Sequence, residues 1–189
     1  MFYTRKGDNG TTKTFGCDQR ISKSSAIAEA LGALDEINSF LGLCKIKAEK
    51  ENKKGSIILE IQGQTFEKTI HNIQKNLFII QAEIAGSKIS IEENKIKEVE
   101  EIIDAIEKEL PPIKNFFISG GVKLAVYFDI ARTIARRAER RVIEVSEEGK
   151  TKVSEFTKAY LNRLSSLLYA LARLTNHKFG INEESPNYK

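Results

Sequence analysis

The sequence predicts an all-α protein, an antiparallel bundle of about five helices with an ordered loop at its N-terminus. Two observations carry the prediction of a bundle. Apolar residues recur at intervals of three and four over five long segments, the spacing that forms one face of an α-helix. Short stretches rich in glycine, proline or charge separate these segments, and short connections favour antiparallel neighbours. The length of 189 residues suits a single domain.

The five helices are expected in order along the chain. The first begins with a serine, which is a favoured N-cap residue. The third opens with Ser90 and Glu93 at the spacing of a capping box, and Pro111 and Pro112 stop it. The expected ranges are about 24–43, 70–86, 90–110, 122–145 and 153–176.

The segments between the helices are less regular. Residues 45–54 are interpreted as a charged, exposed linker. The apolar run 55–63 is bounded by glycines, and the sequence leaves open a short strand, a helical turn or a surface insertion. One domain is therefore expected over the whole chain, 1–189, with three parts: a loop at 1–22, the bundle at 23–176, and a flexible tail at 177–189 that is free to act as a flap.

Composition excludes several classes of protein. The net charge of +4 is modest, because 26 carboxylates are interleaved with 30 lysines and arginines, so a generic nucleic-acid binder is not expected. No apolar run approaches the ~18 residues of a membrane span. Cys17 and Cys44 lack metal-binding spacing and are expected to be free thiols in a reducing compartment. The chain begins with no signal-peptide pattern, so we expect it in the cytoplasm, with neither nucleic acid nor a membrane as partner.

The fourth helix carries a basic stripe. Three arginines recur every fourth residue and share one face, whereas two others lie about 100° away on a neighbouring stripe. Guanidinium groups bind phosphate oxygens in pairs and stay charged at physiological pH, which suits a triphosphate. The alternative is a solvated basic face with Glu139 as an internal partner. The first stripe holds Arg132, Arg136 and Arg140, and the second holds Arg137 and Arg141.

The N-terminal segment YTRKGDNGTTKT, residues 3–14, is a second candidate anion site. It contains two glycines, four threonines and three basic residues. Glycines let backbone N–H groups gather around an anion, and hydroxyl and basic side chains complete the cradle. The alternative is a frayed terminus. The spacing of Gly7 and Gly10 is too short for a Walker loop.

Taken together, the motifs resemble the PduO-type ATP:cob(I)alamin adenosyltransferase (corrinoid adenosyltransferase) family. The N-terminal loop resembles YT[KR]xGDxGxT, and the SGG step followed by ARTIARRAERR resembles the family's arginine helix. The segments EALGALDEINSFLG and YLNRLS resemble its first and last helices. The resemblance spans residues 3 to about 173 in five ordered blocks.

This resemblance implies an enzyme that transfers the 5′-deoxyadenosyl group of ATP to the cobalt of cob(I)alamin and releases triphosphate. The corrinoid supplies the nucleophile, and the protein supplies positioning and electrostatics. Mg²⁺ is expected to arrive with ATP and neutralise charge on the leaving group. The implied ATP-binding residues are Thr4, Arg5, Lys6, Gly7, Thr12, Lys13, Lys23, Arg136, Glu139, Arg140 and Asn162.

The resemblance also implies three residues with catalytic roles and a homotrimer with active sites between its subunits. Phe116 falls where the family keeps an aromatic residue on the lower face of the corrin, in place of the axial base. Asp35 falls where the family places the partner of Arg132, in an ion pair across the subunit boundary. The alternatives are core packing for Phe116 and an ordinary exposed carboxylate for Asp35. Phe117 is the expected core residue of the pair.

The chain departs from the family pattern at Lys6, Ser119, Asp129 and Ser166, and we expect the consequences to fall on corrinoid affinity and specificity. Neither histidine has a glutamate three residues before it, so no protein-held metal site of the ferritin type is expected. Three other functions stay open: another ATP-dependent transferase or kinase, an arginine-helix nucleic-acid module, and a corrinoid carrier without turnover.

Overall fold

The computed structural model describes residues 2–14, 19–55 and 57–188. Within them it contains five helices, as predicted, and two small hairpins, which were not predicted as such. The helices are α1 Ala26–Lys53, α2 Phe66–Ile84, α3 Glu93–Glu109, α4 Lys123–Glu148 and α5 Glu155–Lys178. The strands are β1 Thr11–Lys13, β2 Arg20–Ser22, β3 Glu60–Ile61 and β4 Gln64–Thr65.

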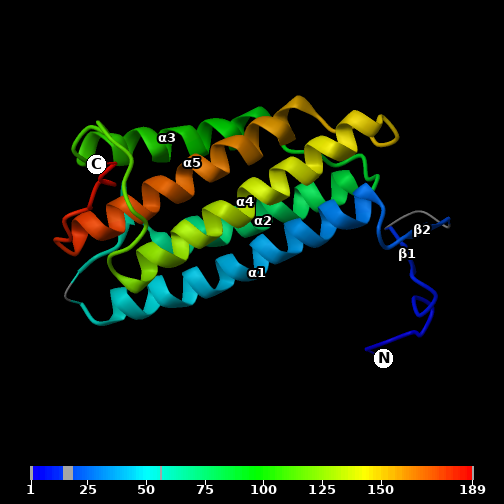
Figure 1. Cartoon of the computed structure of the whole chain (residues 1–189), viewed down its shortest axis with the longest axis horizontal. Helices are drawn as coiled ribbons and strands as arrows, with labels where there is room; N and C mark the ends of the chain where they lie inside the picture. The colour runs from blue at the N-terminus through cyan, green and yellow to red at the C-terminus, as the bar shows by residue number, and fades with distance from the viewer. Residues whose placement is uncertain (1, 15–18, 56, 189) are drawn as a thin grey trace.

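The helices form one bundle, in which α4 contacts both α1 and α5 along most of its length (Figure 1). Successive helices run in opposite directions, so α1 is antiparallel to α2 and to α4, and α4 is antiparallel to α5. Helix α3 packs on α5 and runs in the same direction. The predicted fold class is therefore confirmed, with one parallel pair within the antiparallel arrangement.

Helix α1 is about ten residues longer than the sequence pattern predicted, so the interpretation of 45–54 as a linker is wrong. Cys44, Ala48 and Glu51 are buried at helical spacing and continue the apolar stripe. Lys47 forms an ion pair with Glu51 one turn later, and Lys54 Nζ lies 2.8 Å from the same carboxylate. The charges that suggested a linker thus stabilise the last turns of the helix.

Of the three possibilities for 55–63, the strand is the one observed. Strand β3 pairs with β4 in a hairpin whose two central residues are Gln62 and Gly63. Both have positive φ, 51° and 74°, as a type I′ turn requires. The side chain of Asn52 holds this segment to the end of α1, because its Oδ1 accepts a 2.7 Å hydrogen bond from Leu59 N.

The predicted capping box of the third helix is not formed. Helix α3 begins at Glu93 with Glu92 as its N-cap, and no side chain caps it. Its other end follows the prediction, since Leu110 is the C-cap and Pro111 comes directly after it. Helices α1 and α5 do have serine caps: Ser25 accepts a hydrogen bond from Ala28 N, and Ser154 accepts one from Thr157 N.

Two polar contacts tie helices together inside the core. Glu83 of α2 accepts hydrogen bonds from Ser154 N at 2.6 Å and from Thr157 Oγ1 at 2.5 Å, which joins α2 to the start of α5. Deeper in the bundle, Asn76 donates to the hydroxyl of buried Tyr160 at 3.1 Å.

Burial raises the pKa of the Cys44 thiol to about 12, so this cysteine is an unreactive core residue. Cys17 lies outside the described residues.

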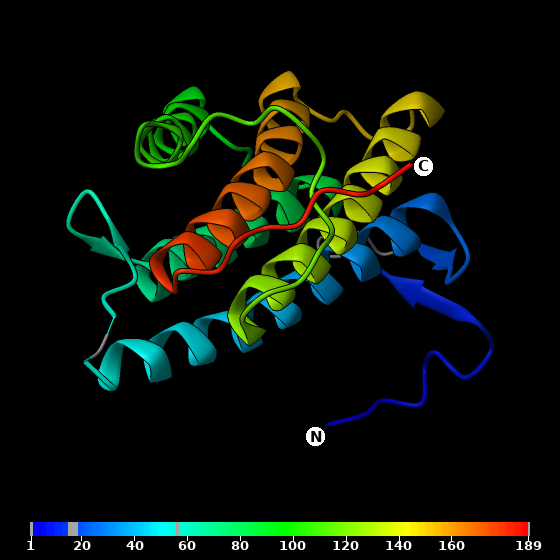
Figure 2. The same ribbon diagram turned by 60° about the vertical axis from the view of Figure 1, so that its left-hand side comes forward.

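The two ends of the chain lie differently relative to the bundle. Strands β1 and β2 pair antiparallel beyond the start of α1, and residues 2–10 extend away from the helices in both views (Figures 1 and 2). The C-terminal segment instead follows the loop between α3 and α4, and Ile118 N donates to Glu184 O at 2.8 Å (Figure 2). None of the five helices of the described residues combines the length and the apolar composition that a membrane span requires.

Candidate active site

A cavity of about 730 Å³ lies where the loop between α3 and α4 meets α4, α5 and the C-terminal segment. Its volume is in the range of small-molecule sites. Its walls combine aromatic rings with two arginines and two carboxylates. The residues that matter below are Phe116, Phe117, Ser119, Asp129, Arg132, Tyr169, Arg173 and Glu183.

The SGG step before α4, residues 119–121, owes its shape to one side chain of α5. Asn176 donates from Nδ2 to Gly120 O at 3.0 Å and accepts at Oδ1 from Val122 N at 3.1 Å. Gly121 has φ +93°, and a Cβ built there would lie 2.1 Å from Asn176 Oδ1. Only glycine fits this position, so the loop reaches α4 in one defined conformation.

Phe116 and Phe117 both line the cavity, but they differ in exposure and in contacts. Phe116 lines the cavity and is 80% exposed, so the alternative that it packs in the core is wrong. The expectation that Phe117 is a core residue is also wrong, because it is only half-buried and its ring lies 4.8 Å below the guanidinium of Arg173. Arg173 is buried and also forms a 2.8 Å ion pair with Glu183 of the C-terminal segment. An exposed aromatic side chain in a cavity is free to contact a ligand.

Arg132 is the arginine of the predicted stripe that enters this cavity. Its guanidinium lies 5.9 Å from the ring centre of Tyr169, and its Nε is buried without a hydrogen-bond partner among the described residues. Asp129, one turn earlier, has a raised pKa because it is half-buried, an effect opposed by the charge of Arg132 and a hydrogen bond with Ser119. A buried guanidinium nitrogen without a partner marks an incomplete site.

The rest of the stripe continues along α4, away from the cavity. Arg136 and Arg140 are exposed, and neither forms a hydrogen bond or ion pair with any described residue. Between them, Glu139 accepts a 3.2 Å hydrogen bond from Asn162 of α5. Four of the predicted ATP-binding residues therefore lie on one face formed by α4 and α5, and two of them are cations with no partner among the described residues.

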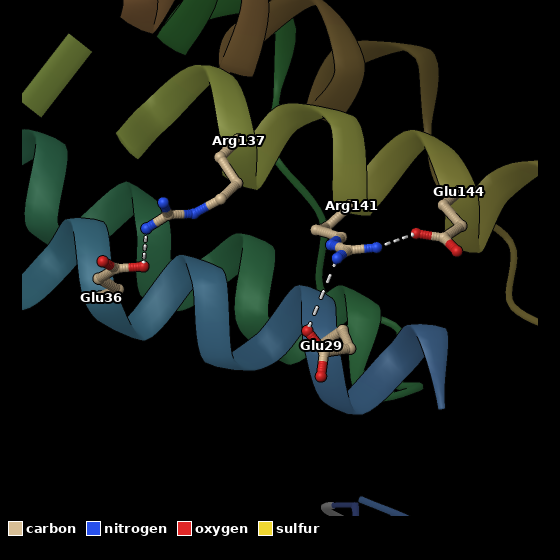
Figure 3. A network of polar contacts seen from close by, with 5 residues as sticks. All are labelled: Glu29, Glu36, Arg137, Arg141 and Glu144. Carbon is tan, nitrogen blue, oxygen red and sulfur yellow. Dashed lines mark hydrogen bonds and ion pairs between the residues drawn. The ribbon is translucent and has the colours of Figure 1, made fainter. Parts of the chain in front are cut away.

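The second stripe has a structural role (Figure 3). Arg137 forms an ion pair with Glu36 of α1. Arg141 lies 2.9 Å from Glu144 and 4.0 Å from Glu29, also of α1. These two arginines are thus partly neutralised at the α1–α4 contact, and their partners are Glu36, Glu29 and Glu144 rather than Glu139. All four arginines from Arg136 to Arg141 are exposed, so the alternative of a solvated basic face stays open.

The N-terminal candidate residues lie together on residues 4–13 with Lys23, which we call the hairpin segment. Arg20 of β2 organises it: its Nε donates to Thr11 Oγ1 at 2.6 Å, and its Nη2 donates to Thr11 O at 2.8 Å and to Lys6 O. Lys23 N donates to Gly10 O at 2.9 Å, and the ammonium of Lys23 lies beside Gly7. The hairpin is therefore ordered around its glycines, and the alternative of a frayed terminus is wrong for the described residues.

Within one chain the predicted residues form three groups. Thr4, Arg5, Lys6, Gly7, Thr12, Lys13 and Lys23 lie on the hairpin segment, which projects from the bundle (Figure 2). The face of Arg136 and Asn162 lies on α4 and α5, and Phe116 and Arg132 lie in the cavity. Asp35 is exposed on α1 and is not paired with Arg132 inside the chain. Among the described residues, no cluster of three or more His, Cys, Asp or Glu could hold a metal ion.

Three important residues were not predicted: Arg20, Arg173 and Asn176. The sequence carried a signal for Arg173, because a lone arginine between Leu171 and Leu174 on an apolar helix face must be buried with a partner. It carried none for Arg20 or Asn176, whose partners depend on the pairing of the hairpin and on the path of a distant loop.

The sequence and the fold belong to a known family. A model of the cobalamin adenosyltransferase family matches residues 2–175, so the chain belongs to this family, and the predicted resemblance is confirmed. The chain is 37% identical over 182 residues to the corrinoid adenosyltransferase PduO of Citrobacter freundii, and the alignment covers 93% of this chain and 50% of that protein. It is 36% identical over 181 residues to the corrinoid adenosyltransferase of Bacillus subtilis strain 168, and this alignment covers 96% of this chain and 89% of that protein.

The chain spans about half the length of the PduO proteins of Citrobacter freundii and Salmonella typhimurium that it matches. Solved structures agree with the family. The chain is similar to a variant of the PduO-type ATP:corrinoid adenosyltransferase from Lactobacillus reuteri complexed with cobalamin and ATP, with a TM-score of 0.85 and 26% identity, covering 100% of this chain and 97% of that one.

Proposed function

We propose that the chain transfers the 5′-deoxyadenosyl group of ATP to cob(I)alamin. The cobalt–carbon bond forms with the electron pair of Co(I), the bond from C5′ to the triphosphate oxygen breaks, and its electron pair leaves with triphosphate. The observation that carries the proposal is the position of the cavity at the start of α4. The next turns of this helix present Arg136 and Arg140, which have no partner in the part of the chain that the structure describes. A corrin ring and a triphosphate need such neighbouring sites.

In this proposal ATP is bound by two parts of the protein. Arg136 and Arg140 would bind the triphosphate from α4, and the Glu139–Asn162 hydrogen bond would fix their face. Backbone N–H groups and basic side chains of the hairpin segment, residues 4–13 with Lys23, would enclose the same phosphates. Mg²⁺ would be held by phosphate oxygens of ATP, where it neutralises charge on the leaving triphosphate.

The cavity would hold the corrin ring with Phe116 against its lower face. The side chain is 80% exposed and extends from a loop that Gly121 and Asn176 hold in place, so it could occupy the axial position without rearrangement of the core. Excluding an axial base from that face makes reduction of Co(II) to Co(I) easier, because the added electron no longer enters an orbital raised by a σ donor. Phe116 would thus favour formation of the nucleophile.

The complete site would lie between the subunits of a homotrimer. Arg132 Nε is buried without a partner in residues 2–14, 19–55 and 57–188, and Asp35 is exposed on α1, so pairing between subunits would satisfy both groups. The projecting hairpin supports the same assembly, because it has a surface available for a neighbouring subunit (Figure 2). The cytoplasmic location stays a prediction from the sequence.

Single-turnover spectroscopy tests the proposed reaction. Mixing the protein with ATP and chemically reduced cob(I)alamin should abolish the Co(I) absorbance and release one triphosphate for each cob(I)alamin consumed. A corrinoid carrier would retain the Co(I) spectrum, and a kinase would release ADP instead of triphosphate. DNA or RNA binding that is tighter than ATP binding and falls steeply with salt would favour the nucleic-acid function.

A further inference from the structure

A second cavity, of about 450 Å³, lies between the end of α3 and the middle of α5. Seven of its eleven lining residues are aliphatic or proline, including Ile103, Leu110 and Ala170. Ile113, in the wall, is 54% exposed although its side chain is apolar. The chain therefore leaves an apolar slot of ligand size unfilled by its own side chains.

The two cavities are neighbours. Ile113, Tyr169 and Arg173 line both of them. A single loop forms part of both walls: Pro111 to Ile113 border the smaller cavity, and Ile113 to Gly120 border the larger one. Phe116 is in the same loop, three residues from Ile113. A group that Phe116 excludes from the larger cavity therefore has the smaller cavity directly beside it.

We propose that the smaller cavity binds the lower base of the corrinoid after Phe116 has displaced it from the cobalt. This inference rests on the proposed function. The displaced base is a flat heteroaromatic ring, and it stays tethered to the corrin through its nucleotide loop, so it must lie within a short distance of the larger cavity. An apolar slot bordered by a tyrosine ring matches such a group in size and chemistry.

Two polar groups on the α5 side of this cavity suit the displaced base. The ring nitrogen that leaves the cobalt becomes a free hydrogen-bond acceptor. Ser166 lines the cavity, is exposed, and forms no hydrogen bond with any described residue, so its hydroxyl is available as a donor. Arg173 is already paired with Glu183, so the cavity presents no unpaired cation on that wall. Binding of the base here would hold the corrinoid in the base-off state and so assist Phe116.

The test compares cobalamin with cobinamide, a corrinoid that lacks the lower nucleotide and base. Wild-type protein with ATP should bind cobalamin at least about tenfold more tightly than cobinamide and should adenosylate both. Ser166→Trp fills the slot from an exposed helix position. It should remove that preference by weakening cobalamin binding, while the affinity for cobinamide and its turnover change less than about twofold.

Two further variants make the comparison decisive. Glu107→Trp fills the same cavity from α3 and should act as Ser166→Trp does, which covers the case that one variant fails to fold. Ser90→Trp places the same bulk at the opposite end of α3 and should leave both affinities unchanged. Equal affinity of wild type for the two corrinoids, or equal weakening of both by the slot variants, would overturn the subsite. Failure of wild type to adenosylate either corrinoid would instead reject the proposed function.

Discussion

Arg136 and Arg137 are adjacent in the chain, yet the bundle gives them different environments. Arg136 is exposed and unpartnered among the described residues, whereas Arg137 is paired with Glu36 across the α1–α4 contact. A helix turns about 100° per residue, so neighbouring side chains reach different faces. Only the first of the two is therefore expected to serve a ligand.

The first prediction follows from this difference. Arg136→Ala should weaken ATP binding by about tenfold to a hundredfold, because a charge-assisted hydrogen bond contributes roughly 1.5–3 kcal/mol. Arg137→Ala is the matched control and should leave ATP affinity within about twofold, since its exposed ion pair contributes little. Isothermal titration calorimetry with ATP measures both. Equal affinities for the two variants would remove Arg136 from the nucleotide site.

A second prediction concerns Phe116. Phe116→Ala should bind ATP and cob(II)alamin nearly normally but leave the cobalt five-coordinate, because water or the base returns to the vacated face. Turnover that starts from cob(II)alamin should fall by orders of magnitude, because each loss of about 1.4 kcal/mol of stabilisation lowers the rate tenfold. Pre-reduced cob(I)alamin should restore much of the rate, since the nucleophile is then already formed.

Electron paramagnetic resonance separates the two states of the cobalt. Wild type with ATP and cob(II)alamin should show a four-coordinate species that Phe116→Ala lacks. Phe78→Ala removes a ring that is similarly exposed, at 64%, but lies on α2, and it should retain the wild-type spectrum. A five-coordinate spectrum in all three proteins, with equal turnover, would mean that Phe116 has no axial role.

At the scale of single elements, the loop before α4 depends on one glycine of a pair. The third prediction is that Gly121→Ala lowers the thermal stability and corrinoid affinity, because its φ of +93° and the 2.1 Å approach of Asn176 Oδ1 leave no room for a methyl group. Gly120→Ala should be nearly neutral, since a Cβ there meets nothing within 4 Å. Thermal denaturation and corrinoid titration check both variants. Identical behaviour of the pair would contradict the proposed anchoring by Asn176.

The contact between α2 and α5 supplies a fourth prediction. Glu83→Ala removes the acceptor for Ser154 N and Thr157 Oγ1, leaving two donors unsatisfied in a buried contact. The free energy of unfolding should fall by about 2–5 kcal/mol. Glu49→Ala removes an exposed carboxylate on α1 and should change stability far less. Urea denaturation distinguishes them, and similar midpoints would show that the buried contact is not important for stability.

The helices could be predicted from the sequence because burial repeats locally. The periodicity located all five, and Pro111 marked the end of α3. It failed at the end of α1, where Lys47 and Glu51 look like a solvated linker by composition although Cys44 and Ala48 continue the buried stripe. Composition and periodicity disagreed there, and periodicity was the better guide.

Site residues were predictable only when their own helix or loop carried the pattern. The two arginine stripes of α4 follow from the angle per residue alone. The pairing of Arg173 with Glu183 and the contact of Asn176 with Gly120 join residues 10 and 56 positions apart. Contacts of this kind depend on the path of the loops, which no local pattern encodes.

At the scale of the whole molecule, the positions of Asp35 and Arg132 predict a site shared between subunits. Each side chain lacks the other as a partner within the chain. In a cyclic trimer, every interface would bring Asp35 of one subunit to Arg132 of the next. Asp35→Ala and Arg132→Ala should therefore each abolish most of the activity, because each leaves a charged partner unpaired in the site.

The fifth prediction is that these two inactive variants restore activity to each other. When Asp35→Ala and Arg132→Ala subunits are unfolded, mixed in equal amounts and refolded, about a quarter of the interfaces should combine an intact Asp35 from one subunit with an intact Arg132 from its neighbour. The mixture should then regain about a quarter of wild-type activity, while each variant refolded alone stays inactive. Light scattering must show a trimer in all samples, and a wild-type monomer at micromolar concentration would exclude the shared site. If the mixture is no more active than its components although both form trimers, Asp35 and Arg132 do not meet across the interface.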